Sequence, residues 1–370
     1  MIYLDNAATS FPKPTCVYKA VKKALEKYCA NPGRSSHYLS SLAQDKVFEA
    51  REVIAEHFSL RSESCVAFCS NATEALNTAI KGLIHEPCNV IISDFEHNSV
   101  LRPLYSLRDR VGIELSEYDT DKDIESELLR LIKPNTRYIV TGLRSNVTGK
   151  EIDYTVLGRI AKSYNITVIA DATQLVGHRS IDLSTSDIDV LCTAGHKGLL
   201  GIQGTGLLLI NRDINILPLK EGGTGYDSLS PYMPERIPEK FEAGTLNLPG
   251  IVSMTAGIKY LNSLGYDEIE RTFNRHEALL NEAISSVTEA KIYGSCGGII
   301  SFNLNGLDSY QVAEELNKQG ICVRGGLHCA PSIHKKLGTE KIGAVRVSTG
   351  LLNTRNDIER LYKVLKSIKR

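Results

Sequence analysis

Short segments in which nearly every residue is apolar recur between residues 89 and 211, and they restrict the fold more than any other feature. A strand buried on both faces has this pattern, whereas a strand with one face in water alternates apolar and polar residues. We therefore predict strands of a covered, mainly parallel sheet at residues 89–94, 137–142, 166–171, 189–195 and 206–211. Between them, segment 154–165 predicts a helix whose apolar stripe contains Val156, Leu157, Ile160, Ala161 and Tyr164. Strands that alternate with helices are typical of an α/β core.

The composition changes after about residue 212. Segment 221–245 is rich in glycine and proline and has no clear periodicity, which predicts a long irregular loop. Beyond it, helices are predicted from about residue 250, followed by alternating strands and helices. A chain of 370 residues is long enough for two domains. We predict a large domain of residues 16–245 and a smaller α+β domain formed by residues 1–15 and 246–370.

The charge and the apolar runs argue against several kinds of partner. The 43 basic residues balance 43 acidic ones, so neither nucleic acid nor an anionic membrane is indicated as the main partner. No apolar run approaches the roughly 20 residues that span a bilayer. The beginning "MIYLDNAATS" lacks the basic and apolar regions of a secretory signal, so we expect a cytoplasmic protein.

The nine cysteines are odd in number and form no CxxC pair, unlike a secreted disulfide framework. Most lie in apolar segments such as "SCVAFC", so we predict that most are small buried side chains in a reducing compartment. Cys329 differs, because "VRGGLHCAPS" is rich in glycine and places His328 beside the thiol. An adjacent imidazole or arginine favours the reactive thiolate. By composition alone, a nucleophile and an incidental loop cysteine remain equally open.

Polar side chains follow the ends of several predicted strands. His97 and Asn146 come just after two of them, Asp171 ends a third, and Lys197 follows a fourth. Open α/β sheets bind ligands at the carboxyl ends of their strands. A carboxylate such as Asp171 at the end of an apolar strand is costly without a cation or hydrogen-bond donor. Each residue alone is compatible with a structural role, but their joint placement indicates one site.

Segment "SNATEALNTAIKGL" predicts a helix that begins after a small polar turn. Its first N–H groups make Ala72 and Thr73 a candidate phosphate-binding cup, although a plain helix cap remains the alternative. A phosphate cup, a lysine, an acid and a flat ring partner are together what pyridoxal 5'-phosphate requires. The sequence therefore predicts a site for this cofactor, and no metal site.

The motifs "YLDNAATS", "SNATEALN", "EHNS", "SNVTG", "ADATQ", "AGHKGLLG", "EAGT" and "HCA" together resemble the class V aminotransferase superfamily. More narrowly, they resemble cysteine desulfurases of the short-loop SufS/NifS kind, from Leu4 to about Gly350. The resemblance implies the fold-type I architecture of enzymes that use pyridoxal 5'-phosphate. This fold has a large domain around a mostly parallel sheet of the seven-stranded type, a smaller C-terminal α+β domain, and a homodimer with shared active sites.

The resemblance also implies roles for the residues of these motifs. Lys197 binds the cofactor and then acts as general base for the Cα proton. Asp171 pairs with the ring nitrogen, His97 stacks on the ring, Gln174 binds the ring hydroxyl, and Asn146 lies near the substrate and the ring substituents. The residues implied to bind the phosphate are Ala72, Thr73, His196 and, from the partner subunit, Thr245.

At the substrate end, the resemblance implies that Arg346 grips the substrate carboxylate, with Arg324 as a second candidate. Cys329 accepts sulfur from L-cysteine as a persulfide, L-alanine is released, and a sulfur-acceptor protein then takes the sulfur. Three alternatives stay open: a selenocysteine lyase, another class V aminotransferase or lyase with an idle Cys329, and a non-catalytic sulfur-transfer partner.

Three positions depart from the family's pattern, and one of them is Ile202, where proline is common. Ala194 stands where a phosphate-binding serine is usual, and Thr193 beside it faces the other side of the strand. Leu327 stands where the SufS-like pattern has a second histidine, which leaves His328 as the local imidazole. Neither the sulfur acceptor nor the preference between cysteine and selenocysteine follows from the sequence.

Overall fold

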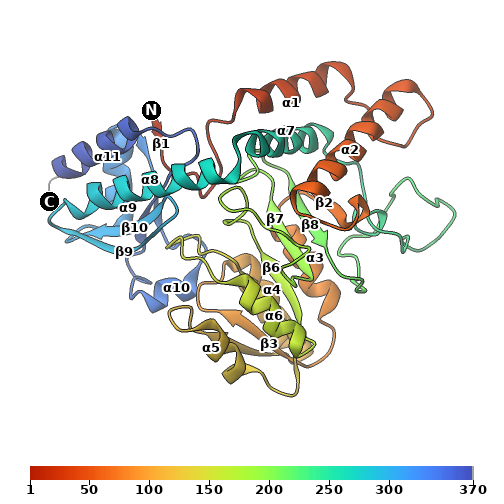
Figure 1. The fold of residues 1–370 in the computed structure, drawn as a ribbon, viewed down its shortest axis with the longest axis horizontal. Helices are drawn as coiled ribbons and strands as arrows, with labels where there is room; N and C mark the ends of the chain where they lie inside the picture. Colours follow the sequence, from red (N-terminus) through yellow and green to blue (C-terminus); the bar gives the residue numbers. More distant parts are fainter. Residues whose placement is uncertain (369–370) are drawn as a thin grey trace.

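The computed structural model describes residues 1–368, and its main element is a seven-stranded sheet in the order β2–β8–β7–β6–β5–β3–β4 (Figure 1). Its strands are β2 (Val66–Cys69), β3 (Asn89–Ser93), β4 (Glu114–Tyr118), β5 (Thr136–Gly142), β6 (Thr167–Asp171), β7 (Val190–Ala194) and β8 (Gly206–Ile210). Neighbours pair in parallel from β7 to β4, whereas β8 runs antiparallel to both β7 and β2. The predicted α/β class and mostly parallel sheet are confirmed.

Helices cover both faces of this sheet, which explains why its strands are apolar throughout. Alternate residues of β8 show the division, since Leu207 and Leu209 join one core and Leu208 and Ile210 join the other. The Leu208 face packs against α3 (Ala72–Leu83) and α4 (Asn98–Val111). The Leu207 face packs against α2 (Tyr38–His57), α6 (Tyr154–Ser163) and α7 (Leu248–Leu264), with α1 (Thr15–Lys27) on α7 and α5 (Ile124–Leu131) beside β4.

A four-stranded antiparallel sheet, in the order β12–β13–β10–β9, forms a second core. Its strands are β9 (Ala290–Cys296), β10 (Ile299–Leu304), β12 (Arg324–Gly326) and β13 (Ala344–Ser348). The helices around it are α8 (Tyr266–Ser285), α9 (Ser309–Lys318), α10 (Pro331–Lys336) and α11 (Arg355–Ser367). Strand β1 (Ile2–Tyr3) pairs in parallel with β11 (Ile321–Cys322), so the N-terminus lies beside this C-terminal unit.

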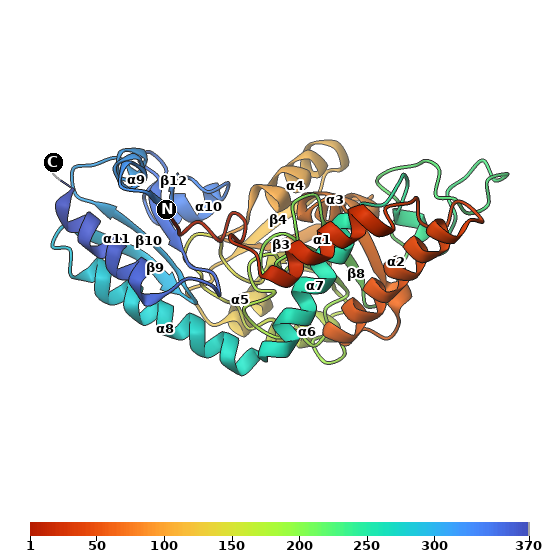
Figure 2. The ribbon, with the colours of Figure 1, turned by 90° about the horizontal axis from the view of Figure 1, so that it is seen from above.

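Helix α8 joins the two cores (Figure 2). Its residues Ile269 and Phe273 belong to the core of the large sheet, whereas Leu280 and Ile284 belong to the core of the small sheet. The predicted division of the chain at residue 245 stays a prediction. Within residues 1–368, no helix is both long enough and apolar enough to cross a bilayer.

Two predictions of burial were wrong. Tyr164 is 52% exposed, because α6 ends at Ser163 and Tyr164 lies beyond the buried stripe. Most cysteines are not fully buried; the buried ones are Cys65, Cys88 and Cys192. Cys16 lies in α1 and Cys29 just after it, and both are exposed because α1 buries only one side on α7.

The long connection after β8 is irregular as predicted, apart from a short 3-10 turn at Glu239–Phe241, and a buried ion pair anchors its end. Arg51 of α2 contacts Glu242 at 2.6 Å, and both side chains are less than a tenth exposed. Arg51 also donates to the carbonyl of Val66, while Glu242 accepts from the N–H of Phe68 at 2.7 Å. Burial raises the pKa of Glu242, and the Arg51 charge opposes that shift.

We expect Arg51→Met to lower the free energy of unfolding by about 3–5 kcal/mol, because it leaves a buried carboxylate without its cation. Denaturant titration measures this change. Lys46→Met is the control, since it removes only a half-exposed pair with Glu49 and is expected to cost less than about 1 kcal/mol. An equal loss in the two variants contradicts the prediction.

Candidate active site

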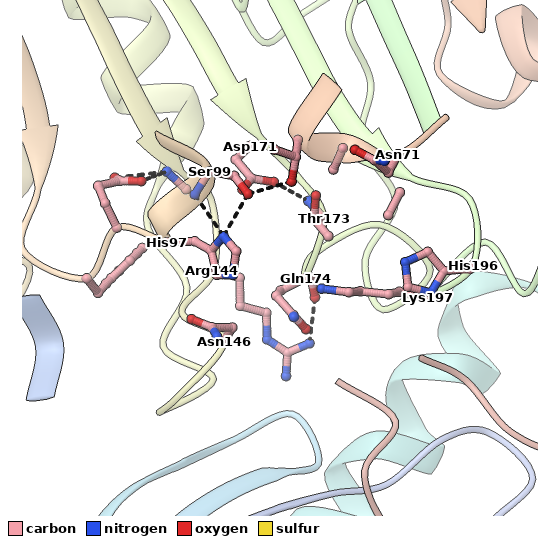
Figure 3. A pocket seen from close by; sticks show the side chains of 16 residues that line it. Asn71, His97, Ser99, Arg144, Asn146, Asp171, Thr173, Gln174, His196 and Lys197 are labelled. Atoms are coloured by element: carbon pink, nitrogen blue, oxygen red, sulfur yellow. Dashed lines mark hydrogen bonds between the residues drawn. The ribbon is translucent and has the colours of Figure 1, made fainter. Parts of the chain in front are cut away.

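A cavity lies at the carboxyl edge of the large sheet (Figure 3). The predicted site residues that line it are Ala72, Thr73, His97, Asn146, Asp171, Gln174, His196 and Lys197. The structure therefore brings together side chains that are spread over more than a hundred residues of sequence.

The beginning of α3 forms one end of the cavity. Asn71 caps the helix, and its side chain accepts from the N–H of Glu74 at 2.9 Å. The N–H groups of Ala72 and Thr73 have no acceptor within the helix, so this end presents donors and a positive dipole to the cavity. Thr73 Oγ1 lies 2.7 Å from Ser99 Oγ. These features suit an anionic group.

Asp171, at the end of β6, forms the opposite wall together with the turn that follows it. Its Oδ1 accepts from the N–H of Thr173 at 2.9 Å, and no described cation pairs with it at salt-bridge distance. Thr173 Oγ1 is buried without a hydrogen-bond partner. Gln174 Nε2 donates to the carbonyl of Ala7 at 3.0 Å. An unpaired acid and an unused hydroxyl in one wall indicate room for a polar ligand.

His97 caps α4, and this contact fixes its ring. Its Nδ1 accepts from the N–H of Ser99 at 3.1 Å, and Figure 3 shows the ring in the cavity wall. Burial lowers the pKa of His97 to about 4, which Asp171 opposes, so the ring is neutral at neutral pH. A neutral, oriented imidazole offers a flat face to a ring. Burial likewise lowers the pKa of His196 to about 4.

Lys197 follows β7 on a loop that packs tightly against the turn after Gln174. A Cβ at Gly198 would lie 1.7 Å from the carbonyl oxygen of Val176, so only glycine permits this approach. Burial lowers the pKa of Lys197 to about 8, and the charge of Asp171 acts in the opposite direction. A substantial fraction of the amine is therefore neutral at mildly alkaline pH.

The N-terminal segment holds the same lysine loop, which the sequence analysis missed. Ser10 Oγ lies 3.1 Å from the carbonyl of His196 and 3.0 Å from that of Lys197. Lys13 Nζ donates to the carbonyl of His196 at 2.7 Å, and burial lowers the pKa of Lys13 to about 8. Only the motif "YLDNAATS" marked this segment, without indicating which loop it contacts.

Two buried ionisable residues of the cavity wall were also missed. Glu96 accepts from Thr141 Oγ1 at 2.9 Å and from the N–H of Gly142 at 3.0 Å, and burial raises its pKa to about 7. Its place directly before His97 was the available signal. Arg144 donates to the carbonyls of Gln174 and Gly297, and thereby joins the cavity wall to the turn between β9 and β10. No sequence pattern marked Arg144.

Ala194 lines the cavity, as its strand position predicts. The hydroxyl of Thr193 is buried away from the cavity and has no hydrogen-bond partner. The strand therefore supplies no hydroxyl in place of the usual serine. Thr245 is exposed and lines a different pocket, so it does not meet Lys197 within this chain.

The two candidate arginines for the substrate lie outside the cavity wall. Arg346 and Arg324 are register partners on β13 and β12. Arg346 is 1% exposed, contacts Asp5 at 2.7 Å and donates to the carbonyl of Asn146 at 2.9 Å. Its Nε is buried without a partner. The Arg346 guanidinium was predicted to bind the substrate carboxylate, but Asp5 already binds one of its nitrogens.

Cys329 is exposed and lies beside the cavity. It lines a surface groove whose wall also contains Thr73, His97 and Ser99, which belong to the cavity as well. Arg324 Nη2 is 3.8 Å from its Sγ. His328 is buried, and its Nε2 lies 3.0 Å from the carbonyl of Ala344. The structure therefore places the arginine, rather than the imidazole, beside the thiol.

Comparison with known proteins defines the class of protein. The model of the family Aminotransferase class-V matches residues 2–361, so the chain belongs to the class V aminotransferases, which depend on pyridoxal 5'-phosphate. Within that class it belongs to the cysteine desulfurase family. It is 34% identical over 99% of its length to a probable cysteine desulfurase of Methanothermobacter thermautotrophicus, of which it covers 94%.

A second curated relative, a probable cysteine desulfurase of Pyrococcus abyssi, is 33% identical over the whole chain and 94% of its own length. Among solved structures, the apo cysteine desulfurase of Thermococcus onnurineus NA1 matches with a TM-score of 0.93 and 31% identity. That match covers 99% of this chain and 94% of the other. A NifS-like protein of 23% identity, with a TM-score of 0.84 over 99% and 98% of the two chains, shows the shared fold.

We expect acetic anhydride to modify Lys197 in the cofactor-free protein with a pH midpoint of about 8. The neutral amine reacts, so modification increases as the pH rises through this value rather than through the ordinary 10.5. Asp171→Asn removes a charge that raises the pKa, so its midpoint should fall below that of the natural protein. Peptide mass spectrometry measures both profiles, and a natural midpoint near 10.5 contradicts the prediction.

Proposed function

We propose that the protein is a cysteine desulfurase that depends on pyridoxal 5'-phosphate, converts L-cysteine to L-alanine and places the sulfur on Cys329. The position of Cys329 carries this proposal, because its groove shares Thr73, His97 and Ser99 with the cavity of Lys197. The names of the curated relatives support the same reaction.

The donors of the cavity fit the cofactor. Lys197 would bind it covalently, Asp171 would face its ring nitrogen, and the neutral His97 would lie against its ring. Gln174 would contact the ring hydroxyl, and the unpartnered hydroxyl of Thr173 marks space for a polar group beside them. The residues proposed to hold the phosphate are Ala72, Thr73 and His196. When bound, the cofactor withdraws electrons from the Cα of an amino acid.

Two side chains of the protein then act on the substrate: Lys197 accepts a proton and Cys329 accepts a sulfur atom. Lys197 accepts the Cα proton, which its lowered pKa favours near pH 8. The Cβ–S bond of the substrate breaks, and the sulfur joins Cys329 Sγ. L-cysteine and the Cys329 thiol thus become L-alanine and a Cys329 persulfide, with no further oxidant or reductant. Arg324 places a cation 3.8 Å from Sγ.

At the substrate end, we propose that Arg346 and Arg324 bind the carboxylate. The unpartnered, buried Nε of Arg346 supports this role, and Asp5 keeps the guanidinium in place at 2.7 Å. Asn146 links this end to the cavity, since it lines the cavity and its carbonyl accepts from Arg346.

We further propose a cytoplasmic homodimer that passes sulfur to an acceptor protein. Thr245 is exposed and lines a pocket other than the one that contains Lys197, which supports its reaching the phosphate of a partner subunit. Residues 16–245 would form the large domain, and residues 1–15 with 246–370 the small one. Sedimentation of the purified protein at twice the mass of the 40.7 kDa chain is the expected result.

Replacing Cys329 by alanine tests the proposed reaction. We expect the natural protein to form alanine from cysteine and to gain one sulfur on the Cys329 peptide, as seen by mass spectrometry. Cys329→Ala should lower alanine formation at least about a hundredfold, because the sulfur acceptor is lost. Cys16→Ala removes another exposed thiol and should leave the rate unchanged.

The same assay distinguishes the alternatives. Alanine formation at the natural rate by Cys329→Ala contradicts the proposal and indicates a lyase in which Cys329 is idle. Selenocysteine is assayed beside cysteine. If only selenocysteine reacts, the protein is a selenocysteine lyase.

A further inference from the structure

One lysine at the end of α10 contacts three carboxylates of the large sheet. Lys336 Nζ lies 2.5 Å from Asp94, 2.5 Å from Asp119 and 2.6 Å from Asp121. Asp94 comes just after β3, and the other two follow β4. The Asp94 side chain is only 8% exposed, so this part of the cluster is poorly screened by water and salt.

The same short helix begins directly after the cysteine turn. Ala330 and Ile333 pack on Phe95 and Val147, which form a small apolar cluster between α10 and the large sheet. Phe95 lies between Asp94 and the cavity residues Glu96 and His97. Helix α10 is therefore fixed to the large sheet by apolar contacts near its first turn and by ion pairs at its last residue.

The cysteine turn itself is strained and depends on its surroundings. His328 and Cys329 both have left-handed backbone angles, with φ of 50° and 57°. Residues with a Cβ adopt this conformation only when their neighbours impose it. The carbonyl of His328 accepts from Asn146 Nδ2 at 2.7 Å, and that of Cys329 accepts from the N–H of Asn98 at 2.7 Å. Asn146 lies in the loop after β5, and Asn98 is the first residue of α4, so both donors belong to the part of the chain built around the large sheet.

We propose that Lys336 is a positioning residue for the sulfur transfer, because its ion pairs hold α10, and through α10 the Cys329 turn, against the cavity. The effect of Lys336 on catalysis rests on the proposed function, whereas its role in holding the Cys329 turn against the large sheet does not. Without Lys336, the clustered carboxylates repel one another, Asp94 loses the cation at 2.5 Å, and the strained turn loses its distal support.

The chain offers matched variants for a test in the enzyme loaded with its cofactor. Lys336→Met removes the charge and keeps most of the side chain's bulk, while Lys336→Arg restores the charge. Lys335→Met is the control, because Lys335 is the preceding residue of α10 and contacts none of the three carboxylates at salt-bridge distance.

Hydrogen exchange at the backbone amide of Asn98 measures whether the Cys329 turn is in place, and it does not depend on catalysis. As the first residue of α4, Asn98 has no acceptor within the helix, so the Cys329 carbonyl is what protects its N–H. Hydrogen–deuterium exchange at Asn98 should rise at least about fivefold in Lys336→Met. Lys335→Met and Lys336→Arg should exchange like the natural protein.

The catalytic readout uses L-cysteine and separates kcat from KM. Lys336→Met should lower kcat for alanine at least about fivefold and change KM less than about twofold, because the substrate site is untouched. Lys336→Arg should restore most of kcat.

Equal exchange at Asn98 and equal kcat in Lys336→Met and Lys335→Met overturn the proposal. If Lys336→Met does not fold, Asp121→Asn replaces it, since that partner is 61% exposed and smaller changes in the same directions are expected. No change in Asp121→Asn then overturns the proposal. If the natural enzyme forms no persulfide, the proposed function fails, while exchange at Asn98 still decides whether Lys336 holds the turn.

Discussion

Parallel pairing from β3 to β7 is the constraint on which the rest of the molecule depends. Parallel strands end at the same edge, so each loop that follows a strand delivers its side chains to one place. His97, Asn146, Asp171 and Lys197 meet for this reason, although they follow or end four different strands. The strands stay in that arrangement because both faces are covered by helices, which makes their apolar sequence a requirement of the fold.

Burial in the cavity lowers the charge of its histidine and lysine side chains. Burial lowers the pKa of His97, His196 and Lys197, so these groups are less charged than they would be in water. In the proposed phosphate site, the N–H groups at the beginning of α3 would therefore do much of the binding. Because Ala194 supplies no hydroxyl, this helix end would carry more of that task than the family's pattern implies.

Patterns within a single segment were enough to predict β3, β5, β6, β7 and β8, but not β2 or β4, and they marked several of the residues that line the cavity. Asp171 and Lys197 each follow a recognisable strand, so their shared edge could be inferred before any contact was known. Contacts between segments that lie far apart in the sequence leave no pattern within either segment. Asp5 meets Arg346, Ser10 holds the lysine loop, and Lys336 reaches Asp94, and each contact joins residues that lie far apart in the sequence. Tyr164 was misplaced because a helical stripe does not mark where its helix ends.

The pairing of β1 with β11 has a consequence for how the chain folds during synthesis. Ile2 and Tyr3 are made before their partners Ile321 and Cys322, which lie more than 300 residues further along the chain. Leu4 likewise belongs to a core that is complete only when β13 and α11 have been made. The N-terminal segment that contacts the lysine loop therefore lacks this anchor until β11 has been made, and long-range pairing of this kind forms slowly. Every strand of the large sheet precedes β11 in the chain, so all of them are made before that anchor is available.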